Sequence, residues 1–231
     1  MVKRRRKPRG RRLRRYLLIA LGCVVLASLV LTVPWRWIAP PTTAFMLSDR
    51  VQNGRPVHRQ WVPMEEISSA LPIAVVASED QKFPDHFGFD FQSLSKALRE
   101  DRGRMRGAST ISQQLAKNLY LWPGRSLSRK AIEAWLTVLI ELTWPKHRIL
   151  EVYLNVVEFG PQVYGVDAAS RRFFGKPPGR VTPREAALLA AVLPAPKRMS
   201  AASPSDYVRK RAAEIEADVI SLGGPRYLSG L

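Results

Sequence analysis

The chain has 231 residues, a formal net charge of +18 at pH 7 and a single cysteine, Cys23. Its length fits one membrane segment plus one globular domain of ordinary size. One cysteine excludes an intrachain disulfide, so the fold cannot be a disulfide-stapled scaffold.

The N-terminus is the most basic part of the chain. Residues 3–15 contain ten Lys or Arg and no acid, which leaves +8 for the rest. That remainder still favours an anionic partner or a membrane surface. A nucleic-acid-binding arm is the alternative for residues 1–15. Beside an apolar segment, a cytoplasmic tail that sets topology and touches anionic lipid is the better interpretation, so we expect no nucleic-acid partner.

An uncharged apolar run, residues 17–33, follows directly, with Tyr16 before it and Trp35 and Trp37 after it. Its length is near the lower limit for crossing a bilayer, and aromatic flanks extend it into both interfaces. A cleaved signal peptide is the alternative, but no Ala-x-Ala site stands at its end. We predict an uncleaved single-pass signal-anchor over residues 16–38, with everything from about residue 39 across the membrane from the basic tail.

Three prolines, Pro34, Pro40 and Pro41, indicate a juxtamembrane linker. The Asn53-Gly54 dipeptide predicts a small hairpin within residues 39–60. After Pro63 the signals are helical, without internal repeats or βα alternation. We therefore predict one mainly α domain over residues 61–231.

An acidic pair, Glu79-Asp80, ends the apolar run 73–77. Carboxylates at the end of a buried segment are costly unless something uses them. Glu79 is therefore a candidate catalytic carboxylate.

A helix expected over residues 109–121 carries two distinct faces. Its apolar face contains Ile111, Leu115 and Leu119. Its polar face contains Thr110, Gln114, Lys117 and Asn118. A solvated surface face is the simpler interpretation, but this face has donors and amides without acids. It also follows the Gly107-Ala108 loop at a helix N-terminus, where anions bind. The pattern predicts an anion-binding face. Together with the Glu79 carboxylate, such a face suits glycosyl or phosphoryl transfer.

The next helix is expected to begin near Ser128 and to end near Trp144. Glu133 lies one turn from Arg129 and Lys130, which could be a surface ion pair contributing a few tenths of a kcal/mol. Leu136 and Ile140 lie beneath Glu133 on the helical wheel and imply partial burial. Glu133 could therefore belong to a structural ion pair or be a site residue, and the sequence does not decide between these two interpretations.

The remaining polar patterns favour structural roles. Helix packing and capping are the better interpretation for four residues of a third helix: Lys146, Glu151, Tyr153 and Asn155. The histidines His58, His86 and His147 are far apart, so a zinc site is not expected, and His86 is expected to be a structural hydrogen-bonding group. Residues 182–185 read as an N-cap, a first-turn proline and a capping-box glutamate, and predict a helix that stops at Pro194.

One match to a catalytic pattern is a decoy. Ser93 and Lys96 have the Ser-x-x-Lys spacing of penicillin-binding acyl-transferases. The partner motifs of that chemistry, Lys-Thr-Gly and Ser-x-Asn, are absent from the sequence, so we treat the match as chance.

At the polar stretches described above, the chain resembles the peptidoglycan glycosyltransferases, glycosyltransferase family 51, which also form one half of bifunctional penicillin-binding proteins. Its Glu-Asp-x-x-Phe-x-x-His-x-Gly pattern is met by Glu79, Asp80, Phe83, His86 and Gly88. Residues 107–118 match Gly-x-Ser-Thr-Ile-x-Gln-Gln-Leu-x-Lys-Asn, and residues 149–155 match Ile-Leu-Glu-x-Tyr-Leu-Asn. The Arg-Lys-x-x-Glu pattern is met by Arg129, Lys130 and Glu133. Ala108 departs from a second glycine found in many members.

The resemblance covers about residues 61–197 and is similar to the monofunctional, membrane-anchored form, because no acyl-transferase half follows. It implies a lysozyme-like, mainly α fold with a small membrane-proximal jaw lobe. It also implies inverting polymerisation of lipid II into β-1,4-linked glycan on the periplasmic side of a bacterial inner membrane.

The resemblance also implies roles for particular side chains. Glu79 is expected to be the base and Glu133 to act on the donor side. Residues expected to bind substrate are Asp80, Phe83, Ser109, Thr110, Gln114, Lys117, Asn118, Arg129 and Lys130. No metal ligand is assigned, although a divalent cation (Mg or Mn) could assist, and division or elongation proteins are conceivable partners. A lytic muramidase on the same fold and a non-catalytic membrane scaffold are the rival functions.

Overall fold

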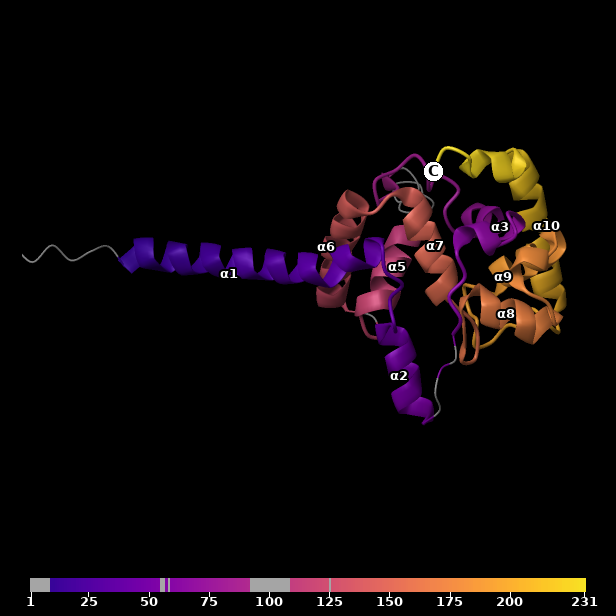
Figure 1. Ribbon diagram of the computed structural model, residues 1–231, viewed down its shortest axis with the longest axis horizontal. Helices are drawn as coiled ribbons and strands as arrows, with labels where there is room; N and C mark the ends of the chain where they lie inside the picture. The colour runs from indigo at the N-terminus through magenta and orange to yellow at the C-terminus, as the bar shows by residue number, and fades with distance from the viewer. Residues whose placement is uncertain (1–8, 55–56, 58, 92–108, 125) are drawn as a thin grey trace, which may run out of the picture.

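The computed structural model describes residues 9–54, 57, 59–91, 109–124 and 126–231 (Figure 1). Three features of the sequence lie outside these residues: the Gly107-Ala108 loop, the Ser93–Lys96 decoy and His58. Helices dominate the described part, and its regular strands form only one two-stranded sheet, which confirms the predicted mainly α class.

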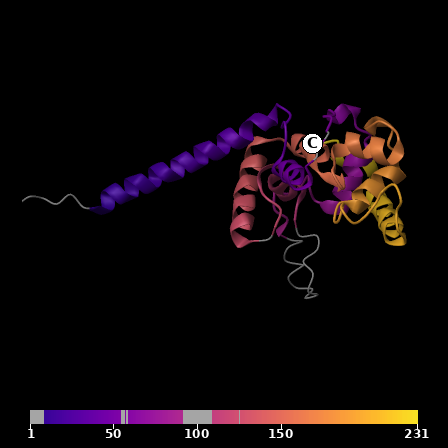
Figure 2. The same ribbon diagram turned by 90° about the horizontal axis from the view of Figure 1, so that it is seen from below.

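The N-terminal helix α1 (Arg9–Thr32) extends away from the domain (Figure 2) and continues into the short η1 (Val33–Arg36). Residues 11–36 form the one described helical segment that is long and apolar enough to cross a membrane. The end of this segment is fixed to the domain by indole N–H groups. Trp144 Nε1 donates to the Thr32 carbonyl at 3.1 Å, and Trp135 Nε1 donates to Ser28 Oγ at 3.1 Å. The predicted apolar segment is therefore a helix joined to the domain without a free linker.

The predicted hairpin at Asn53-Gly54 is wrong. Residues Ala44–Asn53 form helix α2, which begins at the Thr43 N-cap and ends at Gly54. Gly54 has a φ of 64°, and its N–H donates to the Arg50 carbonyl. The Asn-Gly signal marks a left-handed helix C-cap instead of a turn between strands.

One group of helices surrounds the Glu79 segment. Helix α3 (Ala70–Glu79) is buried on all sides from Leu71 to Ala77 and packs against α9 (Pro183–Val192) and α10 (Asp206–Ser221). Thr182 and Glu185 form the predicted capping box of α9. Helix α3 carries no polar face. Its only ionisable side chain is that of Glu79, at its C-terminal end.

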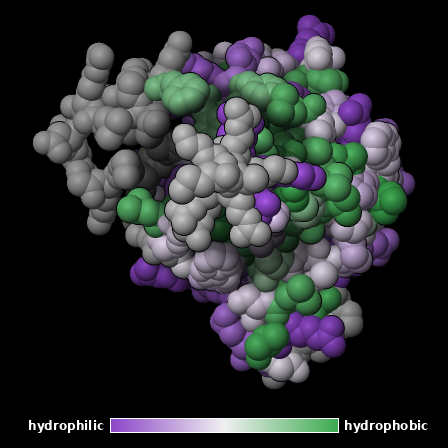
Figure 3. Space-filling model, turned by 90° about the vertical axis from the view of Figure 1, so that its left-hand side faces the viewer, coloured by the Kyte–Doolittle hydropathy of each residue, from purple (hydrophilic) through white to green (hydrophobic). Residues whose placement is uncertain are grey.

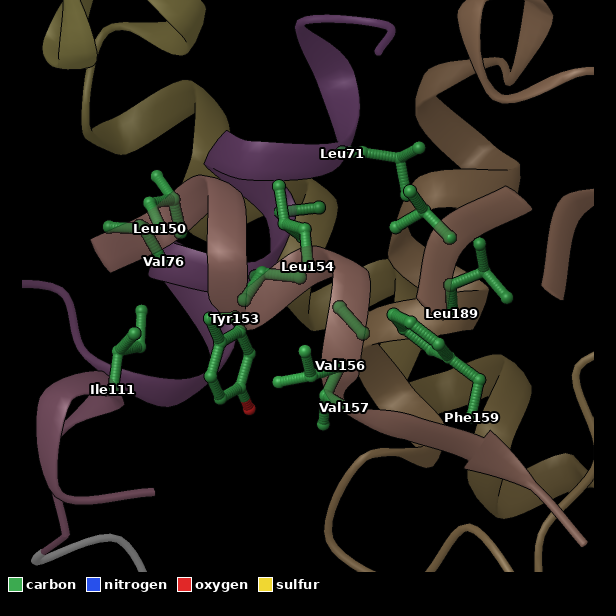
Figure 4. Close-up of a cluster of buried hydrophobic side chains, with 14 of the residues drawn as sticks. Leu71, Val76, Ile111, Leu150, Tyr153, Leu154, Val156, Val157, Phe159 and Leu189 are labelled. Carbon is green, nitrogen blue, oxygen red and sulfur yellow. The ribbon is translucent and has the colours of Figure 1, made fainter. Parts of the chain in front are cut away.

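A second group lies nearer to α1 and contains α5 (Ile111–Tyr120), α6 (Leu127–Thr143) and α7 (Lys146–Val156). The N-cap of helix α6 is Ser126, two residues before the expected Ser128. Figure 1 places α7 between α5 and α6 on one side and α3, α8 and α9 on the other. Tyr153, Leu154 and Ile149 of α7 are fully buried, and Figure 4 shows this helix at the centre of the apolar cluster.

A short antiparallel ribbon, β1 (Glu158–Gly160) and β2 (Val163–Tyr164), connects α7 to α8 (Gly165–Phe174). Gly165 has a φ of 78°, and a Cβ there would lie 2.6 Å from the Asn155 carbonyl oxygen, so only glycine fits. The remaining turns are η2 (Met64–Glu66), η3 (Pro178–Arg180) and η4 (Gly224–Leu228). The ribbon thereby fixes Glu158 directly after the central helix.

Candidate active site

Glu79 is connected to α5 and α7 by a chain of hydrogen bonds. Gln114 Nε2 donates to Glu79 Oε2 at 2.7 Å, and Tyr153 Oη donates to Gln114 Oε1 at 2.9 Å. Burial raises the pKa of Tyr153 well above its usual value, so its hydroxyl remains a donor. This donor fixes the Gln114 amide with its NH₂ group toward Glu79.

Burial also raises the pKa of Glu79 above its ordinary value of 4.5. The hydrogen bond from Gln114 and the charges of Arg211 and Lys117 oppose that rise, and the Asp80 carboxylate adds to it. A half-buried carboxylate with one neutral donor is a stronger base than an exposed one. A raised pKa makes the ionised Glu79 carboxylate a better proton acceptor, which is a property that a general base needs.

Glu133 lies in a cationic cluster at the start of α6. Arg129 Nη1 donates to Glu133 Oε2 at 2.8 Å, while Lys130 Nζ donates to Glu133 Oε1. The Glu133 side chain is 3% exposed and Lys130 is 46% exposed. Arg129 Nε is buried and has no hydrogen-bond partner among the described residues. This cluster is not a simple surface ion pair. Its buried carboxylate orients two cations, and the Arg129 Nε–H remains available as a donor.

Lys117 connects the two glutamates. Burial lowers its pKa, the carboxylates of Glu133 and Glu79 raise it, and the charges of Arg129 and Lys130 lower it. All four groups therefore act on one ammonium group. Because these interactions weaken with distance, Glu79 and the cations belong to one site.

A pocket of about 310 Å³ lies beside this site. Its lining includes the Gln114–Lys117–Asn118 face of α5. Opposite residues come from α2, β1 and the segment after α9, namely Phe45, Glu158 and Lys197. Asn118 is 7% exposed and lines this pocket. Three of the four residues of the predicted polar face, Gln114, Lys117 and Asn118, therefore line a pocket.

Two predicted binding residues, Asp80 and Thr110, make hydrogen bonds that hold the site together. Asp80 accepts hydrogen bonds from His86 Nε2 at 2.8 Å and from the Ile111 backbone N–H at 2.9 Å. Thr110 caps α5 and donates to the Gly88 carbonyl at 2.7 Å. These bonds join the loop after Glu79 to the start of α5, and they confirm the structural role of His86.

Phe83 is another predicted binding residue that the structure places elsewhere. Its ring is fully buried, and the Lys146 ammonium lies 4.5 Å from the ring centroid. A side chain without exposed surface cannot contact substrate here, so we assign Phe83 to the core. Ser109 is exposed, and its hydroxyl lies 3.5 Å from Lys130 Nζ, which keeps it at the cationic cluster.

Two residues of the site were not predicted. Tyr153 was interpreted as a packing residue, although the match to Glu-x-Tyr-Leu-Asn was a usable signal. Arg211 of α10 donates to the Ser78 carbonyl at 3.4 Å, and its charge lowers the pKa of Glu79. No local pattern around Arg211 announces this, because α10 reaches α3 only through the tertiary fold.

The residues do not fit a metal held by the protein. No group of three or more His, Cys, Asp or Glu side chains converges within the described ranges. Both oxygens of Glu133 are already occupied by Arg129 and Lys130. We therefore derive no step through a divalent cation bound by these side chains.

Comparison with known proteins identifies the family of this chain. The profile of a family described as Transglycosylase matches residues 47–219. A "Biosynthetic peptidoglycan transglycosylase" of Xanthomonas campestris pv. campestris (strain B100) is 49% identical over 98% of this chain and 96% of the relative. Proteins of the same name from Pseudomonas putida (strain F1) and Ectopseudomonas mendocina (strain ymp) are 51% and 49% identical over 92% and 96% of this chain, and over 93% and 94% of their own lengths. The chain therefore belongs to the transglycosylase family and is a peptidoglycan glycosyltransferase whose N-terminal helix is long and apolar enough to anchor it in a membrane.

Proposed function

We propose that this enzyme polymerises lipid II, with Glu79 as the base and the Lys117–Arg129–Lys130 cations as the diphosphate site. The observation that carries the proposal is the shared electrostatic environment of Glu79 and these cations around Lys117. A base and a nearby anion site are the two components that glycosyl transfer from a diphosphate donor requires.

The reaction needs one proton transfer and one bond exchange. Glu79 takes the proton of the acceptor sugar hydroxyl as that oxygen attacks the anomeric carbon of the donor. The bond from this carbon to the diphosphate breaks, and the diphosphate leaves with the electron pair. Attack opposite the leaving group inverts the α-linked donor to a β-linked product.

The leaving group explains why one base is sufficient. A diphosphate is already anionic, so it needs positive charge more than a proton. Arg129 supports this role because its buried Nε–H has no partner among the described residues. A muramidase, in contrast, needs a protonated carboxylic acid at the leaving oxygen. Glu133 does not fit that acid, because both of its oxygens accept hydrogen bonds from cations.

The outer face of α6 supports a position at the membrane surface. Large apolar side chains on this helix are exposed: Leu127, Ile132, Trp135 and Leu142. The helix contacts α1, and Figure 3, viewed onto the end of the molecule from which α1 emerges, shows extensive apolar surface there. Since the basic tail favours the cytoplasmic side, we place the domain in the periplasm. Tethering there makes the encounter with a polyprenyl-linked substrate two-dimensional.

The test is incubation of the detergent-solubilised protein with labelled lipid II, beside the variant Glu79→Gln. We expect wild-type protein to form glycan polymer with release of undecaprenyl diphosphate, and the variant to lose all but a small residual part of this activity. Cleavage of preformed glycan would indicate the muramidase instead. Binding without turnover in the wild type would indicate a non-catalytic scaffold.

A further inference from the structure

A second charged cluster on the pocket wall has no part in the chemistry described above. Lys197, after α9, lies with its Nζ 2.6 Å from Asp49 Oδ1 of α2 and 3.6 Å from Glu158 Oε1 of β1. The Asp49 side chain is 3% exposed and that of Glu158 is 11% exposed, whereas that of Lys197 is 53% exposed. Three segments far apart in sequence therefore meet at one ammonium group.

The charges of this cluster do not balance when both acids are ionised. Asp49 Oδ2 and Glu158 Oε1 are buried and have no hydrogen-bond partner in the described part of the chain. Burial raises the pKa of Glu158 to about 7, which Lys197 opposes and Asp49 reinforces. The other groups near Glu158 are the Tyr164 phenol of β2 and the backbone of Gln162. The cluster is thus neutral when Glu158 is protonated and carries one unpaired negative charge when it is not.

Helix α2 connects this cluster to the active site. Near the start of α2, the Phe45 ring faces Lys117, whose ammonium lies 5.5 Å from the ring centroid. One turn later, Asp49 meets Lys197. Beyond these contacts α2 projects from the domain (Figures 1 and 3), and Leu47 and Val51 are 48% and 84% exposed. A helix held by few contacts opens locally at low free-energy cost.

We propose that Asp49, Glu158 and Lys197 form an ionic latch that holds α2 against the domain and so closes the pocket beside Lys117. The latch is tightest when Glu158 is protonated, because the Lys197 ammonium then serves Asp49 alone. When Glu158 ionises, the two carboxylates repel and share one cation, so α2 loosens. These three side chains are positioning residues for substrate binding, a role that rests on the proposed function, whereas the latch itself does not.

Hydrogen–deuterium exchange of the full-length protein in detergent tests the latch without any substrate. The variants are Asp49→Asn, Lys197→Met and Glu158→Gln. The matched control is Lys210→Met, at an exposed lysine of α10 that does not line the pocket. We expect Asp49→Asn and Lys197→Met to lower the protection factors of α2 amides roughly tenfold. Protection of α7 amides should not change, which shows that each variant is folded.

The pH dependence gives a second readout. Wild-type α2 should be better protected near pH 6 than near pH 8, and Glu158→Gln should remove that difference. Unchanged α2 protection in Asp49→Asn and Lys197→Met, or a pH difference that survives in Glu158→Gln, would overturn the latch.

Kinetics then connect the latch to binding. Lys197→Met should raise KM for lipid II several-fold with kcat nearly unchanged, Lys197→Arg should restore KM, and Lys197→Met with Asp49→Asn together should resemble either single change. A fall in kcat at constant KM would contradict the positioning role. If the enzyme did not turn over lipid II, the exchange experiment would still decide on the latch.

Discussion

Glu79 and Glu133 share one site but have opposite surroundings. Glu79 ends an apolar helix, accepts a hydrogen bond from one neutral amide and has its pKa raised by burial. Glu133 is more deeply buried, yet each of its oxygens accepts a hydrogen bond from a cation. The comparison shows that partners, more than burial alone, decide what a carboxylate can do. These surroundings fit the proposed roles, in which Glu79 accepts a proton and Glu133 holds positive charge in place.

The largest expected effect comes from Glu79→Gln. Polymerisation should fall roughly 10²- to 10⁴-fold, because the general base is lost while the amide can still meet Gln114. The pKa of Glu79 is higher in the folded protein than in the unfolded chain. Ionisation of Glu79 at high pH therefore lowers the free energy of unfolding of the wild type. The variant should therefore have a higher Tm than wild type near pH 8. Lipid II turnover and thermal unfolding measure the two effects.

Glu133→Gln should lower both activity and stability, in contrast to Glu79→Gln. Arg129 and Lys130 would lose the carboxylate that orients them, and we expect about a 10²-fold loss of turnover. The Tm should fall, because a buried guanidinium loses its partner. Glu216→Gln, which removes a partly exposed ion pair with Arg184, is the matched control and should change little. A raised Tm in Glu133→Gln would show that the two carboxylates are not opposites.

The bridge between Tyr153 and Glu79 has an intermediate effect. Tyr153→Phe keeps the ring in the core and removes one hydrogen bond, so activity should fall about 2- to 10-fold. Gln114→Leu removes both hydrogen bonds, and should cost more and raise the pKa of Glu79. Steady-state kcat/KM over a pH series measures both changes. Equal effects of the two variants would mean that the amide orientation does not depend on Tyr153.

The smallest expected effect belongs to Arg211→Gln. The Arg211 charge lowers the pKa of Glu79, so its loss should shift the acid limb of activity upward by a few tenths of a pH unit. Added salt should reduce the difference between variant and wild type, since Arg211 is partly exposed. A shift to lower pH would contradict the assigned direction.

The sequence predicted those parts of the molecule that depend on local signals. The capping box at Thr182, the apolar N-terminal helix and the placement of Glu133 above Leu136 all follow from spacing along one helix. Long-range features were missed. The contact of Arg211 with the Glu79 segment joins positions more than a hundred residues apart.

Two errors show where local signals are ambiguous. Asn53-Gly54 suits a hairpin turn and a helix C-cap equally, and the choice depends on what precedes it. The Phe83 prediction came from the family resemblance, which identifies a characteristic position but not whether its side chain faces the core or the substrate.

The central claim is that ionised Glu79 takes the acceptor proton. The most direct test is the pH dependence of kcat/KM for lipid II in the wild type and in Glu79→Gln. Wild-type activity should rise with pH through a midpoint above the ordinary value of 4.5, because burial raises the pKa of this base. The residual activity of Glu79→Gln should lack that rise. A variant profile that keeps the wild-type midpoint would contradict the assignment, since another group would then be accepting the proton.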